Sequence, residues 1–335
     1  MVISRRGLFA LDFAGTSRQA TEWLRVHRTA MACRFEVTLA PTDAGHVNAA
    51  RAALDETDRI ESLLTVFRET SELSRVNREA ATGPVRTEPE VFELLQRCAR
   101  LHLDTRGAFD ITSTPLSRCW GFLRREGRLP APDEIARARA LVGTNRVTLD
   151  AVHSTVQFAA PGMALNLGAI GKGYAVDRMG HVMRGRGVQH ALISAGGSSV
   201  LAIGGRGRGW TVDIRSRVDI RSRQVRRERL VRVRLRDAAL GTSGAGEQFV
   251  LVDGVRYGHV IDPRTGWPAR GMLSASVVTR DAATADALST AFLIAGPELA
   301  KRYCTSHPET LALLMLDAGT ERLQIFGSCP GAQVL

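Results

Sequence analysis

Chemically versatile side chains are concentrated in residues 259–268, which read HVIDPRTGWP. This run holds an imidazole at His259, a carboxylate at Asp262, a guanidinium at Arg264 and a hydroxyl at Thr265. Imidazole titrates near neutral pH, so His259 is a candidate base. From the residue types alone, a catalytic turn and a solvated structural turn both remain open.

The element that must position His259 is a predicted hairpin. Asp253-Gly254 is the pair that a tight type I′ turn favours, because glycine accepts a positive φ without steric cost. We expect residues 249–252 to pair with residues 255–261, so that the second strand carries His259. The strand should end near Pro263, which has no N–H to donate to a ladder. A rival role for His259 is therefore a structural hydrogen bond across the hairpin.

A second candidate is the run NLGAIGKGYAVD at residues 166–177. Three glycines lie within six residues just before a helical pattern, where backbone N–H groups can approach an oxyanion that the helix dipole also attracts. Lys172 can add a charged contact to such a group. The spacing matches neither a Walker A loop nor the Rossmann GxGxxG, so a phosphate loop follows only weakly from the glycines.

A third candidate lies near the C-terminus, in TADALSTAF at residues 284–292. On a helix, Asp286 and Thr290 are four positions apart and share a face. A carboxylate and a hydroxyl are hard oxygen ligands of the kind that Mg²⁺ prefers. The alternative is a capped and exposed helix start, with no metal.

Several further elements follow from periodicity. Residues 29–40 predict one strand, and residues 47–67 predict an amphipathic helix whose apolar stripe includes Phe67. Helices are also expected at 89–103 and 133–141, paired strands at 147–149 with 156–158, a strand–turn–strand unit at 191–205, and closing strands at 311–316 and 323–326. Because strands and helices are interleaved irregularly and hairpins are prominent, we expect an α+β fold.

Residues 212–223 consist of two identical copies of VDIRSR, and arginines continue through Arg236. An even repeat keeps strand alternation in phase, so the segment 212–236 is expected to be an inserted hairpin. Its arginines alternate with Val231, Val233 and Leu235, which predicts an edge hairpin with a solvated cationic face. A more specific alternative is that these arginines form an electrostatic docking site for an acidic partner. No nucleic acid is expected, because no aromatic residues are interleaved for base stacking.

Composition sets broad limits. The chain has 335 residues, 44% of them hydrophobic, and a net charge of +11 that suits an anionic substrate. Five scattered cysteines without a CxxC suggest neither a disulfide framework nor a zinc site. No stretch approaches the roughly 18 apolar residues of a membrane span.

Residues 1–22 are interpreted as a leader or disordered arm before a domain at 23–335. Their start, SRRGLF, is similar to a twin-arginine signal, but Asp12 interrupts a short apolar run. We therefore favour a cytoplasmic location over export.

Five motif blocks, in order along the chain from about residue 29, resemble the ApbE-type family of FAD:protein FMN transferases. The blocks are LLTVFRETSELSRVNR, FDITSTPLSRCWGF, NLGAIGKGYAVD, TSG with HVIDPRTGWP, and ADALSTA. The resemblance implies mixed, largely antiparallel sheets with flanking helices, in a two-lobed fold with an FAD cleft.

The resemblance also implies roles for particular residues. In the implied reaction His259 is the candidate base, because imidazole titrates near neutral pH, and Asp262 would orient it or bind nucleotide. Mg²⁺ would be held by Asp286, Thr290 and the carbonyl of Ala169. The remaining residues would contact FAD: Met31, Phe67, Ala108, Phe109, Asp110, Lys172, Thr242 and Ile261.

The implied reaction transfers FMN from FAD to a threonine or serine of an acceptor flavoprotein and releases AMP. In the family the acceptor carries an Asp-Gly-x-Ser/Thr-Gly-Ala type sequence. Two departures matter: Ser198 replaces a common aspartate, and Ala245 follows TSG where an acidic or amide residue is common. They leave two alternatives open, a Mg²⁺-dependent FAD pyrophosphatase and a non-enzymatic FAD-binding protein. The sequence does not define the oligomeric state.

Overall fold

The computed structural model describes residues 23–217, 227–246, 248–318 and 322–335. The expectations for residues 1–22 and for the second copy of the duplicated segment, residues 218–223, lie outside the described residues. Within the described part of the chain, no helix is long and apolar enough to cross a membrane.

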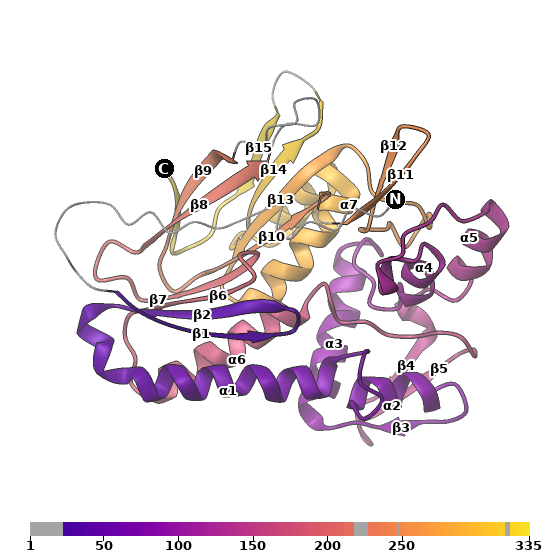
Figure 1. Ribbon diagram of the computed structural model, residues 1–335, viewed down its shortest axis with the longest axis horizontal. Helices are drawn as coiled ribbons and strands as arrows, with labels where there is room; N and C mark the ends of the chain where they lie inside the picture. Colours follow the sequence, from indigo (N-terminus) through magenta and orange to yellow (C-terminus); the bar gives the residue numbers. More distant parts are fainter. Residues whose placement is uncertain (1–22, 218–226, 247, 319–321) are drawn as a thin grey trace.

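The centre of the fold is an eight-stranded sheet with the order β1-β2-β6-β7-β10-β13-β14-β15, antiparallel throughout. Helices α1, α6 and α7 cover one face of this sheet (Figure 1). Its strands are β1 (Leu24–Ala30), β2 (Cys33–Leu39), β6 (Ala191–Ala195), β7 (Ser199–Ile203), β10 (Ala239–Gly244), β13 (Met272–Thr279), β14 (Leu311–Leu316) and β15 (Leu323–Gly327).

The helices divide into two groups. The long helices α1 (Val47–Leu64), α6 (Gly171–Gly185) and α7 (Ala282–Ser306) pack on the central sheet, and Gly296 kinks α7 with a φ of 72°. A second lobe holds α2 (Glu72–Glu79), α3 (Pro89–Asp104), α4 (Thr114–Cys119) and α5 (Pro132–Arg139) beside the small sheet β3-β5-β4 (Figure 1). That sheet consists of β3 (Val85–Arg86), β4 (Val147–Asp150) and β5 (Thr155–Phe158), and short 3₁₀ helices span Pro41–His46, Phe122–Arg124 and Thr144–Arg146. This arrangement confirms the α+β class.

A three-stranded sheet, β16-β9-β8, covers the other face of the central sheet. It consists of β8 (Trp210–Arg217), β9 (Arg227–Leu235) and β16 (Ala332–Val334). The expected alternation is present, since Val231, Val233 and Leu235 are buried in a second core. The expectation of an edge position is wrong for β9, which lies between β8 and β16. The cationic face is also not purely solvated, because Arg232 is paired with the buried Asp213 at 2.7 Å.

Two expected elements have different bounds. Residues 29–40 do not form one strand, because Met31 and Ala32 make a tight turn between β1 and β2 with φ values of 48° and 56°. Helix α1 ends at Leu64, so Phe67 is not part of its core stripe and is 74% exposed. The other predicted helices and strands are present within a few residues of their expected limits.

The predicted hairpin of β11 (Phe249–Val252) and β12 (Val255–Gly258) is present. Asp253 and Gly254 have φ values of 50° and 76°, as a type I′ turn requires. Strand β12 is shorter than expected and ends at Gly258, so His259 lies just beyond it. The hairpin packs on α4 and α5 through Val250, Leu116 and Trp120, and the Trp120 indole donates to the carbonyl of Gly266 at 2.9 Å.

Candidate active site

A cavity of about 290 Å³ lies between the two lobes; we call it the first cavity. Segments far apart in the sequence line it: the α3–α4 loop, the loop before α6, the ends of β10 and β12, and α7. Ten predicted site residues belong to its wall: Ala108, Phe109, Asp110, Ala169, Lys172, Thr242, His259, Ile261, Asp286 and Thr290.

An adjoining cavity of about 230 Å³, the second cavity, contains the other two predicted contacts, Met31 and Phe67. It lies between the β1–β2 turn, the end of α1 and the start of α6, and is lined largely by apolar residues. Asn166, Gly168 and Lys172 line both cavities. The pair therefore offers one chamber with mixed polar and apolar walls and one mostly apolar chamber, and the two share a wall.

Asp286 is deeply placed in α7, with 2% of its surface exposed. Its carboxylate accepts a hydrogen bond from the N–H of Gly173 at 3.0 Å, and Lys172 Nζ lies 3.8 Å away. A Cβ on Gly173 would lie 2.1 Å from the carbonyl of Ala282, so only glycine allows α6 and α7 to approach this closely. The alternative of an exposed helix start at Asp286 is wrong, and the helix cap is Asp281.

Two of the three glycines, Gly171 and Gly173, lie in the first turn of α6 and not before it, and Gly173 has a structural role that the sequence did not indicate. One of their N–H groups, that of Gly173, is donated to a protein carboxylate and not to a ligand. Asp177, one turn further along α6, accepts hydrogen bonds from the N–H groups of Ala282 and Ala283 at 2.7 and 2.9 Å. Contacts in both directions thus fix the first turns of α6 and α7 relative to each other.

The oxygen atoms around Asp286 suit a hard cation. Thr290 and Ala169 line the same cavity, so the residues with the predicted carboxylate, hydroxyl and carbonyl ligands lie around one space. Ser243, which sequence reasoning missed, links Thr290 and Ser289 through hydroxyl contacts of 2.9 and 2.8 Å. Within the described ranges, no cluster of three or more His, Cys, Asp or Glu side chains suits a metal. The donor set therefore fits Mg²⁺ better than a softer ion.

His259 lies on the first cavity and is tied to the hairpin. Its N–H donates to the carbonyl of Gln248 at 3.0 Å, and its Nδ1 lies 3.3 Å from the same oxygen. The rival structural role is thus partly realised. A carbonyl only accepts hydrogen bonds, so the contact places a proton on Nδ1 of the His259 ring.

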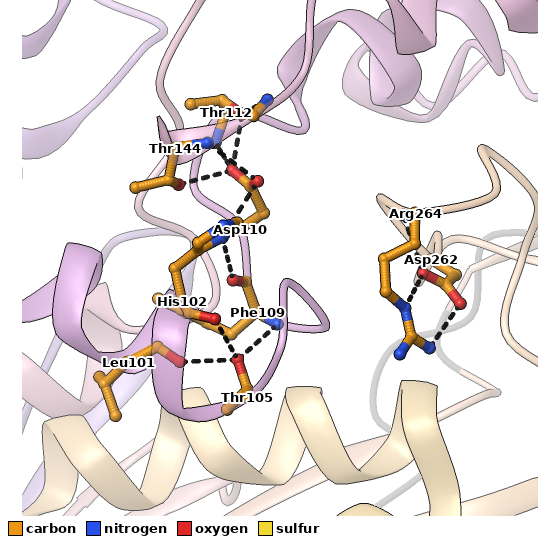
Figure 2. A network of polar contacts seen from close by, with 10 residues as sticks. Leu101, His102, Thr105, Phe109, Asp110, Thr112, Thr144, Asp262 and Arg264 are labelled. Carbon is orange, nitrogen blue, oxygen red and sulfur yellow. Dashed lines mark hydrogen bonds and ion pairs between the residues drawn. The ribbon is translucent and has the colours of Figure 1, made fainter. Parts of the chain in front are cut away.

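Asp262 lines neither cavity. Its carboxylate accepts two hydrogen bonds from the Arg264 guanidinium, each of 2.8 Å, and one from the Arg264 N–H at 2.9 Å (Figure 2). These contacts shape the turn after His259. They make Asp262 a structural residue of this turn, and its predicted role in orienting His259 or binding nucleotide stays a prediction.

Asp110 forms part of the first cavity's wall, but its carboxylate takes part in an internal network (Figure 2). It accepts hydrogen bonds from the hydroxyls of Thr112 and Thr144 at 2.6 and 2.8 Å, and His102 Nδ1 lies 3.2 Å away. Burial opposes the charge on Asp110, yet these partners outweigh it and hold the pKa of the carboxyl below its ordinary value. Burial likewise opposes charge on His102, but Asp110 raises the pKa of the imidazole.

The two departures from the family pattern sit at the first cavity or next to it. Ser198 lines the cavity, and its carbonyl accepts from the Thr242 N–H at 2.7 Å. The Ala245 N–H donates to the Leu273 carbonyl at 3.1 Å, so the backbone after TSG stays attached to β13. The backbone at both positions is therefore hydrogen-bonded to a neighbouring segment.

Comparison with known proteins places the chain in a family. The model of the ApbE family matches residues 31–315. An FAD:protein FMN transferase of Klebsiella pneumoniae (strain 342) is 32% identical over 75% of this chain and 71% of its own length. A protein of the same name from Treponema pallidum (strain Nichols) is 32% identical over 82% of this chain and 77% of its own. The crystal structure of the Thermotoga maritima ApbE protein superposes with a TM-score of 0.79 at 29% identity, over 92% of this chain and 97% of its own. This chain belongs to the ApbE family.

Proposed function

We propose that the protein transfers FMN from FAD to a threonine or serine hydroxyl of an acceptor flavoprotein, with Mg²⁺ bound and with release of AMP. The observation that carries this proposal is the convergence of His259, Lys172, Asp286 and Thr290 on one cavity that adjoins a mostly apolar second cavity. The proposal is also supported by relatives in the family that bear the name FAD:protein FMN transferase.

The bond changes are those of a phosphoryl transfer. The acceptor oxygen attacks the phosphorus on the FMN side of the pyrophosphate, and the bond from that phosphorus to the bridging oxygen breaks. AMP leaves with the bridging oxygen, and the hydroxyl proton passes to a base. Such reactions depend mainly on positioning and on stabilising charge at the phosphate oxygens.

His259 is the proposed base. The carbonyl of Gln248 orients its ring through Nδ1, and Nε2 is the nitrogen that would accept the proton. The ring lines the same cavity as Asp286 and Lys172, so an acceptor hydroxyl that enters the cavity meets the base and the phosphate-binding groups together. Lys172 adds a positive charge for the phosphates.

Asp286, Thr290 and the Ala169 carbonyl would hold the Mg²⁺. The ion supplies charge neutralisation at the phosphate oxygens when it is bound. The protein's own contribution is rigidity: Gly173 donates to the Asp286 carboxylate, and Ser243 links Thr290 to Ser289. These contacts hold two ligands in place before the ion arrives.

The test is to incubate the purified protein with FAD and Mg²⁺, with and without a protein that carries an Asp-Gly-x-Thr-Gly-Ala sequence. AMP release together with an FMN-sized mass gain on the acceptor threonine is the expected result. AMP without modification of the acceptor would overturn the proposal in favour of an FAD pyrophosphatase. FAD binding without AMP in either reaction would overturn it in favour of a flavin-binding protein.

A further inference from the structure

The turn between β1 and β2 has an unusual backbone. Met31 and Ala32 have φ values of 48° and 56°, a left-handed region that residues with a Cβ occupy only under constraint. Ala30 pairs with Cys33 on either side, so the hairpin register fixes where the two residues lie. Both line the second cavity. A strained turn is therefore held at a binding surface.

Glu61 of α1 supplies a contact that holds this turn. Its Oε2 accepts a hydrogen bond from the Met31 N–H at 3.0 Å, a group at the turn position where the strand ladder offers no partner. Its Oε1 lies 3.7 Å from Arg68. The backbone carbonyl of Glu61 accepts from the Thr65 N–H at 3.1 Å, where α1 ends. One residue thus joins two walls of the second cavity, the turn and residues 65–67.

The position of the turn determines where the Met31 side chain lies. A Cβ on Gly171 would be 3.3 Å from Met31 Cε, so the methionine packs against the first residue of α6. The next residue, Lys172, lines both cavities. Displacement of the turn would therefore change the wall of the second cavity near the point where the two cavities join.

We propose that Glu61 is a positioning residue, which holds the Met31–Ala32 turn in the wall of the second cavity and thereby sets the affinity for FAD. The inference rests on the proposed function, since it takes one planar ring system of FAD as the occupant of the second cavity. Glu61 acts through Met31, so its loss should weaken FAD binding while leaving the rate at saturating FAD unchanged.

The experiment compares Glu61→Ala, Glu61→Gln, Ala32→Gly and the double variant Glu61→Ala/Ala32→Gly. FAD affinity is measured by titration of flavin fluorescence, and AMP release is measured at saturating FAD. We expect Glu61→Ala to weaken FAD binding about tenfold, with AMP release at saturation within about twofold of wild type. Glu61→Gln should bind like the wild type, because its amide oxygen still accepts from Met31.

The double variant Glu61→Ala/Ala32→Gly provides the most decisive comparison. Glycine adopts the φ of Ala32 without strain, so Ala32→Gly should recover most of the affinity lost in Glu61→Ala, a larger gain than it gives in the wild-type background. Equal effects of Ala32→Gly in both backgrounds would overturn the inference, because they would show no coupling between the two sites. A Glu61→Gln protein as weak as Glu61→Ala would also overturn it.

Two further measurements separate this inference from others. Arg68→Ala removes only the charge partner of Glu61 and should leave FAD affinity within about twofold. Hydrogen exchange at the Met31 amide should accelerate in Glu61→Ala and stay slow in Glu61→Gln, and unchanged exchange in both would contradict the account. Retained FAD binding without transfer to an acceptor would count against the proposed function. The FAD affinities and the exchange rate of the Met31 amide would still test the role of Glu61.

Discussion

The two adjoining cavities differ in what they offer a dinucleotide. The first is lined by ionisable and hydroxyl groups such as Lys172, His259 and Asp286, and most of these come from the second half of the chain. The second is lined mainly by apolar groups such as Met31, Leu64 and Phe67, and most come from the first 70 residues. We propose that the first cavity performs the chemistry and that the second contributes affinity.

The burial of key residues follows the same division. Asp286 has 2% of its surface exposed and is fixed by a neighbouring helix, whereas Phe67 is 74% exposed. A buried carboxylate can hold a cation in a fixed place, and an exposed aromatic can cover a ligand that has entered. Variants in the two cavities should therefore separate turnover from binding.

The largest expected effect comes from Asp286→Ala. Loss of the proposed metal carboxylate should reduce AMP release by about 10³-fold or more, the scale of losing electrostatic stabilisation of a transition state. FAD binding measured without Mg²⁺ should change by less than about threefold. Asp317→Ala, which alters an exposed carboxylate after β14, is the control and should be silent. Normal turnover by Asp286→Ala would refute the metal assignment.

His259→Gln sharpens the account of the first cavity. Glutamine can still donate to the Gln248 carbonyl but has no basic nitrogen, so the structural role survives and the base does not. We expect the rate at saturating FAD to fall by about 10²- to 10⁴-fold, with an unchanged melting temperature. Wild-type turnover by this variant would show that the cross-hairpin contact is the whole role of His259.

Asp110→Asn tests whether the Asp110–His102 pair beside the first cavity contributes to the free energy of unfolding. The Asp110 pKa is lowered, so its contribution exists above about pH 3.9 and is lost as the pH falls through the folded value. The His102 pKa is raised, so its contribution exists below about pH 6.5 and is lost as the pH rises through the folded value. The pair is therefore strongest between these limits.

Denaturant unfolding should show that Asp110→Asn lowers the free energy of unfolding by about 3 kcal/mol near pH 5.5, because one partner of a buried pair is removed. The loss should be smaller at a pH above the raised pKa of His102, where the imidazole has lost its charge and the hydroxyl and backbone contacts of Asp110 remain. A loss that is the same at both pH values would show that His102 does not take part.

The smallest effect is expected in the second cavity. Phe67→Ala removes an exposed ring that covers the cavity, and we expect a three- to tenfold weaker affinity for FAD from a lost stacking contact. The rate at saturating FAD should stay within about twofold. Isothermal titration with FAD, combined with AMP release, checks both values, and a fall in the saturated rate would break the proposed division between the cavities.

Much of the site could be predicted from the sequence where a local signal existed. Asp253-Gly254 specified a type I′ turn, and the four-residue spacing of Asp286 and Thr290 placed both on the same cavity. The Met31–Ala32 turn gave no such signal, because residues with a Cβ at positive φ are set by tertiary contacts such as that of Glu61.

Long-range pairing explains most of the other errors. Strand β9 is central only because β16, about 100 residues later, pairs with it, and no local pattern in the arginine-rich run indicates this partner. The role of Gly173 depends on the approach of α7, more than 100 residues away. The prediction that Asp110 lies against FAD stays a prediction: the residue lines the first cavity, and its carboxylate also contacts Thr112, Thr144 and His102. The central position of β9 and the role of Gly173 were therefore determined by contacts with residues distant in the sequence.

The most direct test of the account is a comparison of Asp286→Ala with Phe67→Ala, in which AMP release and acceptor mass are followed at saturating FAD and Mg²⁺. The account predicts that Phe67→Ala modifies the acceptor at close to the wild-type rate and that Asp286→Ala binds FAD but releases no AMP. An active Asp286→Ala protein, or a Phe67→Ala protein whose saturated rate falls in step with its affinity, would contradict it.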